Sequence, residues 1–208
     1  KEIAGRKDLR DLPMVTIDGE DAKDFDDAVS IEKFEEGKVR LGVHIADVTH
    51  YVKQNSKLNQ EALERGTSIY LVDRVIPMLP EKLSNGICSL KPRQNRLTLS
   101  VVMDYQLAPL KLIDYKIFPS IIKTNYRMTY NEVREILVEE NKEVIEKYRD
   151  FVPKLELMNQ LREGLRTERF ANGSLDFDFP EVEVKLDENG HPVDLSQRTH
   201  GIPEQLIE

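Results

Sequence analysis

The feature of this sequence that most constrains its fold is an acidic stretch at residues 18–27 (DGEDAKDFDD), in which six carboxylates stand against a single lysine. Apolar segments that favour β-structure flank it, residues 14–17 (MVTI) before it and residues 28–31 (AVSI) after it. The pattern predicts two strands joined by an acidic loop. Carboxylates that a fold holds together repel one another, and this repulsion raises their pKa values or calls for a cation.

Three interpretations of this loop are open. Clustered oxygen ligands on a short loop suit Mg²⁺ or Mn²⁺, which take one or two carboxylates each and keep waters for a phosphate group. A solvated acidic turn is the commonest fate of an arbitrary run of charges. A calcium loop of the EF-hand type is the weakest option, because no Gly and Glu follow Asp26 at the required spacing.

Composition narrows the class of protein. The chain has 208 residues, of which 39% are hydrophobic, and this is enough for one good-sized core. Its formal net charge of −8 counts against a free-standing nucleic-acid binder. Cys88 is the single cysteine, which excludes an internal disulfide and suits a reducing compartment. No apolar run approaches the ~18 residues of a transmembrane helix and no signal-peptide pattern is present, so a cytoplasmic protein without membrane contact is expected.

Alternating sequences predict several strands. Residues 38–46 place four aliphatic side chains on one face and His44 on the other. A lone histidine in this position is more often a hydrogen-bonded structural residue than a metal ligand. Residues 67–72, 97–103 and 111–122 are also strand-like, and an antiparallel meander through these strands is expected. The prediction is an α+β fold, a mostly antiparallel sheet with packed helices.

Helices are expected around these strands. Residues 55–64 predict a helix closed by Gly66, with Leu58, Ala62 and Leu63 on its buried side. A short turn is expected at residues 81–85, ended by Gly86, and a capping box at Thr129 and Glu132. A longer helix ended by Asn172 and Gly173 is expected to bury a stripe of Val152, Leu155, Met158, Leu161 and Leu165. A hairpin is expected to turn at Asn189 and Gly190.

Residues 16–28 (TIDGEDAKDFDDA) closely resemble the signature of the ribonuclease II / ribonuclease R family, within its catalytic RNB domain, and the Gly19-Glu20-Asp21 variant resembles the ribonuclease R branch. Further matches follow in order at residues 43–52 (VHIADVTHYV), 65–70 (RGTSIY), 77–80 (PMLP) and 83–90 (LSNGICSL). The resemblance implies a hydrolase of RNA degradation, a processive 3′-to-5′ exoribonuclease that cleaves single-stranded RNA, and not DNA, to nucleoside 5′-monophosphates. Residue pattern alone reaches only metal-dependent phosphoryl transfer.

By the same resemblance, Asp18, Asp24, Asp26 and Asp27 hold Mg²⁺, for which Mn²⁺ is a substitute, and carry the chemistry. Asp18 and Asp27 are the first choice as direct ligands, Asp24 completes the shell, and Asp26 is expected to be the most critical for catalysis. Two ions about 3.5–4 Å apart would orient a water and stabilise the attacking and leaving oxygens.

The resemblance also suggests residues that bind RNA. Tyr70 and Phe177 are expected to stack on the last bases, and the alignment at the second of these positions can slip to Phe179. Tyr130 matches a second family tyrosine near the RNA path, although a hydrophobic anchor at a helix start would look the same. Arg93 and Arg96, with Lys91, form a basic cluster for which a solvated loop and phosphate contact are both open.

The chain is expected to be one domain over residues 1–208, the truncated N-terminal part of an RNB domain, without the flanking cold-shock and S1 domains of OB type that would add RNA affinity. It begins with Lys1 and ends in residues 201–208, which predict the first turns of a helix. Because the family active site also uses an arginine beyond Glu208, the chain by itself is expected to be nearly inactive. The alternative is a catalytically inactive RNB-like module that binds RNA or a protein partner, against which the presence of all four aspartates argues.

Overall fold

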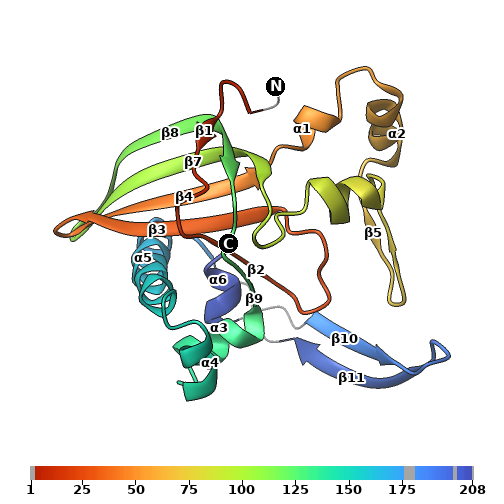
Figure 1. Ribbon diagram of the computed structural model, residues 1–208. Helices are drawn as coiled ribbons and strands as arrows, with labels where there is room; N and C mark the ends of the chain where they lie inside the picture. Colours follow the sequence, from red (N-terminus) through yellow and green to blue (C-terminus); the bar gives the residue numbers. More distant parts are fainter. Residues whose placement is uncertain (1–2, 176–180, 199–200, 208) are drawn as a thin grey trace.

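The computed structural model describes residues 3–175, 181–198 and 201–207 of the chain. Its main element is a seven-stranded sheet with the strand order β1-β8-β7-β4-β3-β2-β9 (Figure 1). These strands are β1 (Lys7–Asp8), β2 (Val15–Asp18), β3 (Asp27–Glu35), β4 (Lys38–Ala46), β7 (Arg96–Leu107), β8 (Leu110–Ile122) and β9 (Tyr126–Thr129). Two separate hairpins are formed by β5 (Ile69–Tyr70) with β6 (Val75–Ile76) and by β10 (Glu181–Leu186) with β11 (Pro192–Arg198).

The sheet is mostly antiparallel, as predicted. Strands β4, β7 and β8 form the expected antiparallel meander, which β3 extends, whereas residues 69–70 pair in a separate hairpin and not in this sheet. Within the sheet the two outer pairs, β1 with β8 and β2 with β9, are parallel. The helices are α1 (Val48–Tyr51), α2 (Lys57–Arg65), η1 (Leu83–Ile87, a π-helical turn), α3 (Tyr130–Leu137), α4 (Lys142–Lys147), α5 (Val152–Ala171) and α6 (Ile202–Gln205). The α+β prediction is therefore confirmed.

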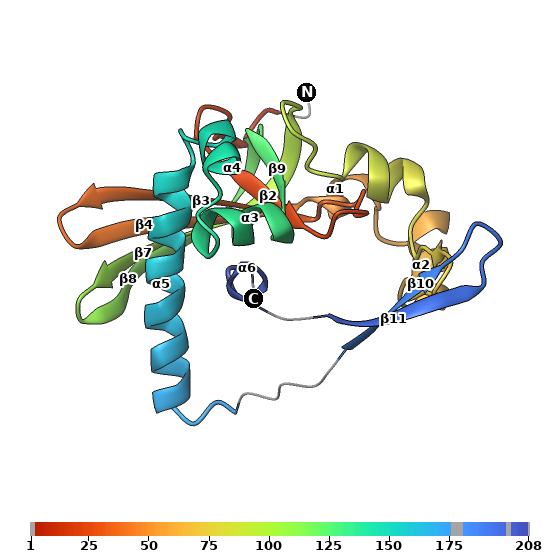
Figure 2. The ribbon, with the colours of Figure 1, turned by 90° about the horizontal axis from the view of Figure 1, so that it is seen from below.

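The main core lies between one face of the sheet and the helices α3, α4 and α5 (Figure 2). The predicted stripe of α5 is confirmed, because Leu155, Met158 and Leu161 are buried against β3. The capping box that starts α3 is also present, with the Glu132 amide donating to the Thr129 hydroxyl and the Thr129 amide to the Glu132 carboxylate. Each such cap is worth about 1 kcal/mol of stability.

The opposite face of the sheet carries a buried polar network around His44. The His44 Nε2 lies 3.0 Å from the Ser30 hydroxyl and its Nδ1 lies 2.6 Å from the Ser100 hydroxyl. The interpretation of His44 as a hydrogen-bonded structural histidine is confirmed. Gly42 makes room for this contact, because a Cβ there would stand 2.4 Å from the Ser30 hydroxyl oxygen.

The segment that joins β4 to β7 differs most from the prediction. None of the side chains of residues 47–87 is fully buried. Leu63, predicted to face the core, is 74% exposed. Leu58 and Ala62 on the same predicted side are half-buried, and α2 has no fully buried residue. The expected strand over residues 67–72 is reduced to Ile69–Tyr70, and the expected helical turn at residues 81–85 continues as η1 through Gly86 instead of ending there.

The C-terminal elements follow the predicted pattern. The hairpin of β10 and β11 turns at Asn189 and Gly190, and Gly190 has a positive φ of 81°. A helix begins after Gly201, with Pro203 early in it. Among the described residues, no helix has both the length and the apolar character to cross a membrane.

Candidate metal centre and nucleic-acid interface

The sheet brings the acidic loop, residues 18–27, to one of its ends. Strand β2 ends at Asp18 and β3 begins at Asp27. The register places Asp27 opposite Ile45 at the end of β4, and Asp18 opposite Thr129 at the end of β9. The loop therefore lies where β2, β4 and β9 end and where the chain enters α1 and α3 (Figure 1).

Backbone and hydroxyl contacts hold the C-terminal half of the loop against the sheet. The Ser89 hydroxyl is fully buried, accepts a hydrogen bond of 3.1 Å from the Phe25 amide and donates one of 2.8 Å to the Lys23 carbonyl. The Leu90 amide donates to the Phe25 carbonyl and the Ala46 amide donates to the Asp26 carbonyl, each at 2.8 Å. These four bonds fix the backbone on both sides of Asp24 and Asp26.

Arg127 of β9 holds the N-terminal half of the loop from the other side. Its Nη2 donates to the Gly19 carbonyl and to the Glu20 carbonyl, the latter at 2.7 Å. Its guanidinium carbon lies 5.5 Å from the centre of the Phe25 ring. Asn131 of α3 adds a hydrogen bond of 2.7 Å to the Glu20 side chain. Contacts on two sides thus keep the loop from spreading, although its carboxylates repel one another.

The electrostatics of the site show this crowding. Burial raises the pKa of Asp18 to about 7, with the charge of Asp27 adding to the rise and that of Arg127 opposing it. Burial, followed by the charges of Asp24 and Asp27, raises the pKa of Asp26, and burial raises the pKa of Asp27. The Oδ2 atom of Asp18 is buried and has no hydrogen-bond partner among the described residues. An acceptor in this condition is suited to a cation.

The carboxylates are close to one another but do not form a complete set of metal ligands. Among the described residues, no group of three or more His, Cys, Asp or Glu side chains is placed to hold a metal ion. The donor set fits a hard divalent cation, because it consists of carboxylate oxygens on a short loop and includes one unpartnered oxygen. Asp18, Asp26 and Asp27, with Asp24 acting on Asp18 and Asp26, are the residues that could hold it.

A mostly apolar cavity of about 620 Å³ adjoins Asp27. It lies between the sheet and α5, and Val43, Met103 and Leu161 form part of its wall. Its lining also includes Arg162, Arg166 and Arg169, which project from successive turns of α5. The charged part of the lining thus combines two carboxylates, Asp27 and Glu168, with three arginines.

The predicted RNA-binding residues are placed as follows. Tyr70 is 71% exposed on the β5–β6 hairpin. Tyr130 is half-buried at the first position of α3 and follows Thr129, which lies opposite Asp18 at the start of the acidic loop. Arg93 is exposed. Arg96 donates hydrogen bonds to the carbonyls of Ser89, Gly86 and Asn95 and to the Gln94 side chain, so most of its donors are used within the protein. Phe177 and Phe179 lie outside the described residues.

Sequence reasoning missed the residues that hold the loop. Arg127 lies outside the family motifs of the sequence, and its role depends on the parallel pairing of β9 with β2, which places it opposite Thr16. Ser89 lies within the motif at residues 83–90, where its position pointed to the family without indicating its contacts.

Comparison with known proteins agrees with this fold and shows the family. The family model for the RNB domain matches residues 6–208, and the chain belongs to the RNB family. Its relatives include ribonuclease R of Thermotoga maritima, 52% identical over the whole chain and 29% of that protein, and ribonuclease R 1 of Lactococcus lactis, 49% identical over the whole chain and 25% of that protein. The structure of Mycoplasma genitalium RNase R in complex with ribose methylated single-stranded RNA matches 98% of the chain with a TM-score of 0.89, at 32% identity and over 31% of that protein. The chain thus spans less than a third of the length of each.

Proposed function

We propose that this chain is the metal-binding part of a 3′-to-5′ exoribonuclease that hydrolyses single-stranded RNA processively to nucleoside 5′-monophosphates. The proposal is supported by membership of the RNB family and by relatives named ribonuclease R. The single observation that carries it is the acidic loop, residues 18–27. Two sets of contacts hold its crowded carboxylates at the end of the sheet, and the Asp18 Oδ2 has no partner among the described residues.

The proposed roles of the aspartates follow from their positions. Asp18 and Asp27 end β2 and begin β3, so their backbones are fixed by the sheet and they would serve as direct ligands of Mg²⁺. Asp24 would complete the ligand set, and Asp26 would position the attacking water. When bound, Mg²⁺ supplies positive charge that polarises the phosphodiester and lowers the pKa of a bound water.

The remaining parts of the site would position the RNA. Exposed Tyr70 offers a ring on which a base can stack without regard to sequence, and Tyr130 lies near the acidic loop. Arg93, and the arginines of α5 that line the same cavity as Asp27, would supply positive charge for phosphates. Arg96 would mainly hold the segment at residues 86–89 and would contribute less to phosphate binding. Phe177 is proposed as the partner of Tyr70.

A titration with Mn²⁺ tests the metal site without requiring activity. Calorimetry on the 208-residue chain should show saturable binding that is lost in Asp18→Asn. The matched control is Asp104→Asn, because Asp104 lies on the same sheet but pairs with Arg40. Equal binding by wild type and Asp18→Asn would refute the assignment of Asp18, and binding that appears only when RNA is added would mean that phosphate completes the ligand set.

An activity assay tests the proposed reaction. The chain would replace the matching segment of Thermotoga maritima ribonuclease R, to which it is 52% identical, and 5′-labelled single-stranded RNA would be incubated with Mg²⁺. A ladder that shortens from the 3′ end, lost in Asp26→Asn, is expected. The 208-residue chain by itself is expected to be nearly inactive, because it spans only 29% of that relative. Internal cleavage, or full activity of Asp26→Asn, would contradict the proposal.

A second function is favoured by one observation. Because no group of three or more candidate ligands is placed to hold a metal among the described residues, the chain could instead be an RNB-like module that binds RNA or a protein partner without catalysis. This module would bind RNA equally well with Mg²⁺ and with chelator, and Asp26→Asn would leave its behaviour unchanged. The titration and the activity assay separate the two functions.

A further inference from the structure

Residues 47–95, here called the arm, leave the sheet at the end of β4 and return to it at the start of β7. The arm contains α1, α2, the β5–β6 hairpin and η1, and it projects from the same end of the sheet as the acidic loop (Figures 1 and 2). Residues 47–87 have no fully buried side chain. Between its ends the arm has no buried core. Its two ends pack into one buried cluster, in which Val48, Leu83 and Leu90 lie with Phe25 of the acidic loop. The position of the arm therefore depends on the contacts at these two ends.

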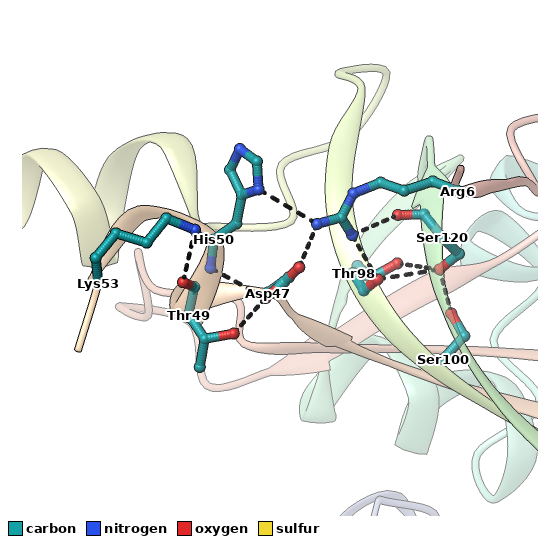
Figure 3. A network of polar contacts seen from close by, with 8 residues as sticks. All are labelled: Arg6, Asp47, Thr49, His50, Lys53, Thr98, Ser100 and Ser120. Carbon is teal, nitrogen blue, oxygen red and sulfur yellow. Dashed lines mark hydrogen bonds and ion pairs between the residues drawn. The ribbon is translucent and has the colours of Figure 1, made fainter. Parts of the chain in front are cut away.

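At the first end, an ion pair between Arg6 and Asp47 fastens the arm to the sheet (Figure 3). The Arg6 side chain is 9% exposed and that of Asp47 is 15% exposed. Arg6 also donates hydrogen bonds of 3.2 and 3.3 Å to the carbonyls of Thr98 in β7 and Ser120 in β8. One guanidinium thus joins the first residue of the arm to two strands.

Asp47 also caps the first helix of the arm. Its Oδ1 accepts hydrogen bonds from the Thr49 hydroxyl and the His50 amide, which makes it the N-cap of α1. Partial burial alone would raise the pKa of Asp47, but the hydrogen bonds from Arg6 and Thr49 outweigh this effect and lower the pKa. Arg6 therefore stabilises the charged form of Asp47. As the N-cap of α1, Asp47 also fixes the direction in which the arm leaves the sheet.

The other end of the arm is fastened by Arg96, which reaches back to the carbonyls of Gly86 and Ser89. Residues beside both anchors contact the acidic loop. Ser89 binds the backbone of Lys23 and Phe25, and Ala46, directly before Asp47, donates to the Asp26 carbonyl. At the first end the contact with the acidic loop is one residue from Asp47, and at the second end it is made by Ser89, which Arg96 itself binds.

We propose that Arg6 and Asp47 are a pair of positioning residues that fix the arm, and with it Tyr70, relative to the acidic loop. Neither residue touches the RNA or the metal. Their effect on RNA binding passes through Tyr70, and this part of the inference rests on the proposed function. Without the pair the arm would remain attached but would sample several positions, and Tyr70 would no longer stack on a base near the acidic loop.

Hydrogen exchange on the 208-residue chain tests the anchor in the absence of RNA. Asp47→Asn removes the charge and keeps the cap, because Asn caps helices as well as Asp does. We expect amides of α1 and η1 to exchange about tenfold faster, while amides in the centre of β4 and β7 are unchanged. Arg6→Gln should give the same result, and Arg6→Lys, which keeps the charge, should restore part of the protection.

Asp104→Asn is the matched control, because it breaks the Arg40–Asp104 pair between β4 and β7, far from the arm. Unchanged exchange in the arm of both Asp47→Asn and Arg6→Gln would overturn the proposal.

RNA binding tests the consequence for Tyr70. With labelled single-stranded RNA and Ca²⁺ in place of Mg²⁺, Tyr70→Ala should weaken binding by about tenfold, the loss of one stacked base. In the Asp47→Asn background the same substitution should have little further effect, whereas in the Asp104→Asn background it should keep its full effect. A full Tyr70 effect in the Asp47→Asn background would overturn the coupling. If the wild type binds no RNA, the proposed function fails, and the exchange experiment alone still decides whether the anchor exists.

Discussion

Replacing His44 should make the free energy of unfolding less sensitive to mild acid. Burial lowers the pKa of His44 from 6.5 to about 4 in the folded chain. Below pH 6.5 the unfolded chain binds a proton at this residue that the folded chain does not bind, so acid favours unfolding. The contribution of neutral His44 is therefore fully present above pH 6.5 and is lost as the pH falls towards about 4.

The magnitude follows from the size of the shift. A shift of about 2.5 pKa units corresponds to about 3 kcal/mol, because each unit is worth about 1.4 kcal/mol, and about 2 kcal/mol of this is already lost at pH 5. His44 has no exposed surface, so solvent screening does not reduce the figure. The raised pKa of Asp18, about 7, acts in the opposite direction, since protonation there stabilises the folded chain in acid. A comparison of wild type with a His44 variant cancels that effect.

The assay is urea unfolding of the wild type and of His44→Gln between pH 7.5 and pH 4.5. The variant should be less stable at pH 7.5, because Ser30 and Ser100 lose part of their hydrogen bonding, and the difference should shrink by about 2 kcal/mol on going to pH 5. A difference that stays constant with pH would refute the reasoning, because it would mean that His44 takes up a proton equally well in the folded and unfolded chains.

Three further predictions follow from the structure. Gly42→Ala should destabilise the chain by about 1–3 kcal/mol in thermal or urea unfolding, because its Cβ would clash with the Ser30 hydroxyl, and an unchanged midpoint would contradict this. Arg127→Gln should leave the unfolding midpoint nearly unchanged but speed hydrogen exchange at residues 20–26, and equal exchange would show that Arg127 does not hold the acidic loop. Leu63→Ser should change stability by less than about 0.5 kcal/mol, because Leu63 is 74% exposed, and a larger loss would mean that α2 is packed against another surface.

Local patterns in the sequence predicted the elements whose form depends on near neighbours. The alternation at residues 38–46 matches β4, the Thr129 and Glu132 pair caps α3, and the stripe through Leu155 and Leu161 faces the core. In each case the residues that decide the structure are a few positions apart, so the chain itself carries the whole signal.

The prediction for Leu63 was wrong for the opposite reason. An apolar stripe on a helix indicates burial only if another element packs against it, and the long connection from β4 to β7 places α2 away from the sheet. The two-residue strand at Ile69–Tyr70 has the same cause, because a β-prone sequence extends a strand only where a partner strand continues beside it.

By itself the sequence determined the family and the candidate site, because four aspartates on a loop between two strands and the family motifs around them are local features. Only the tertiary structure decided how that loop is held. Arg127 and Ser89 lie more than 60 residues from their partners in the loop, and Arg6 lies 41 residues from Asp47. These contacts exist because the strand order brings distant segments to one end of the sheet, and no pattern in the neighbouring residues records such an arrangement.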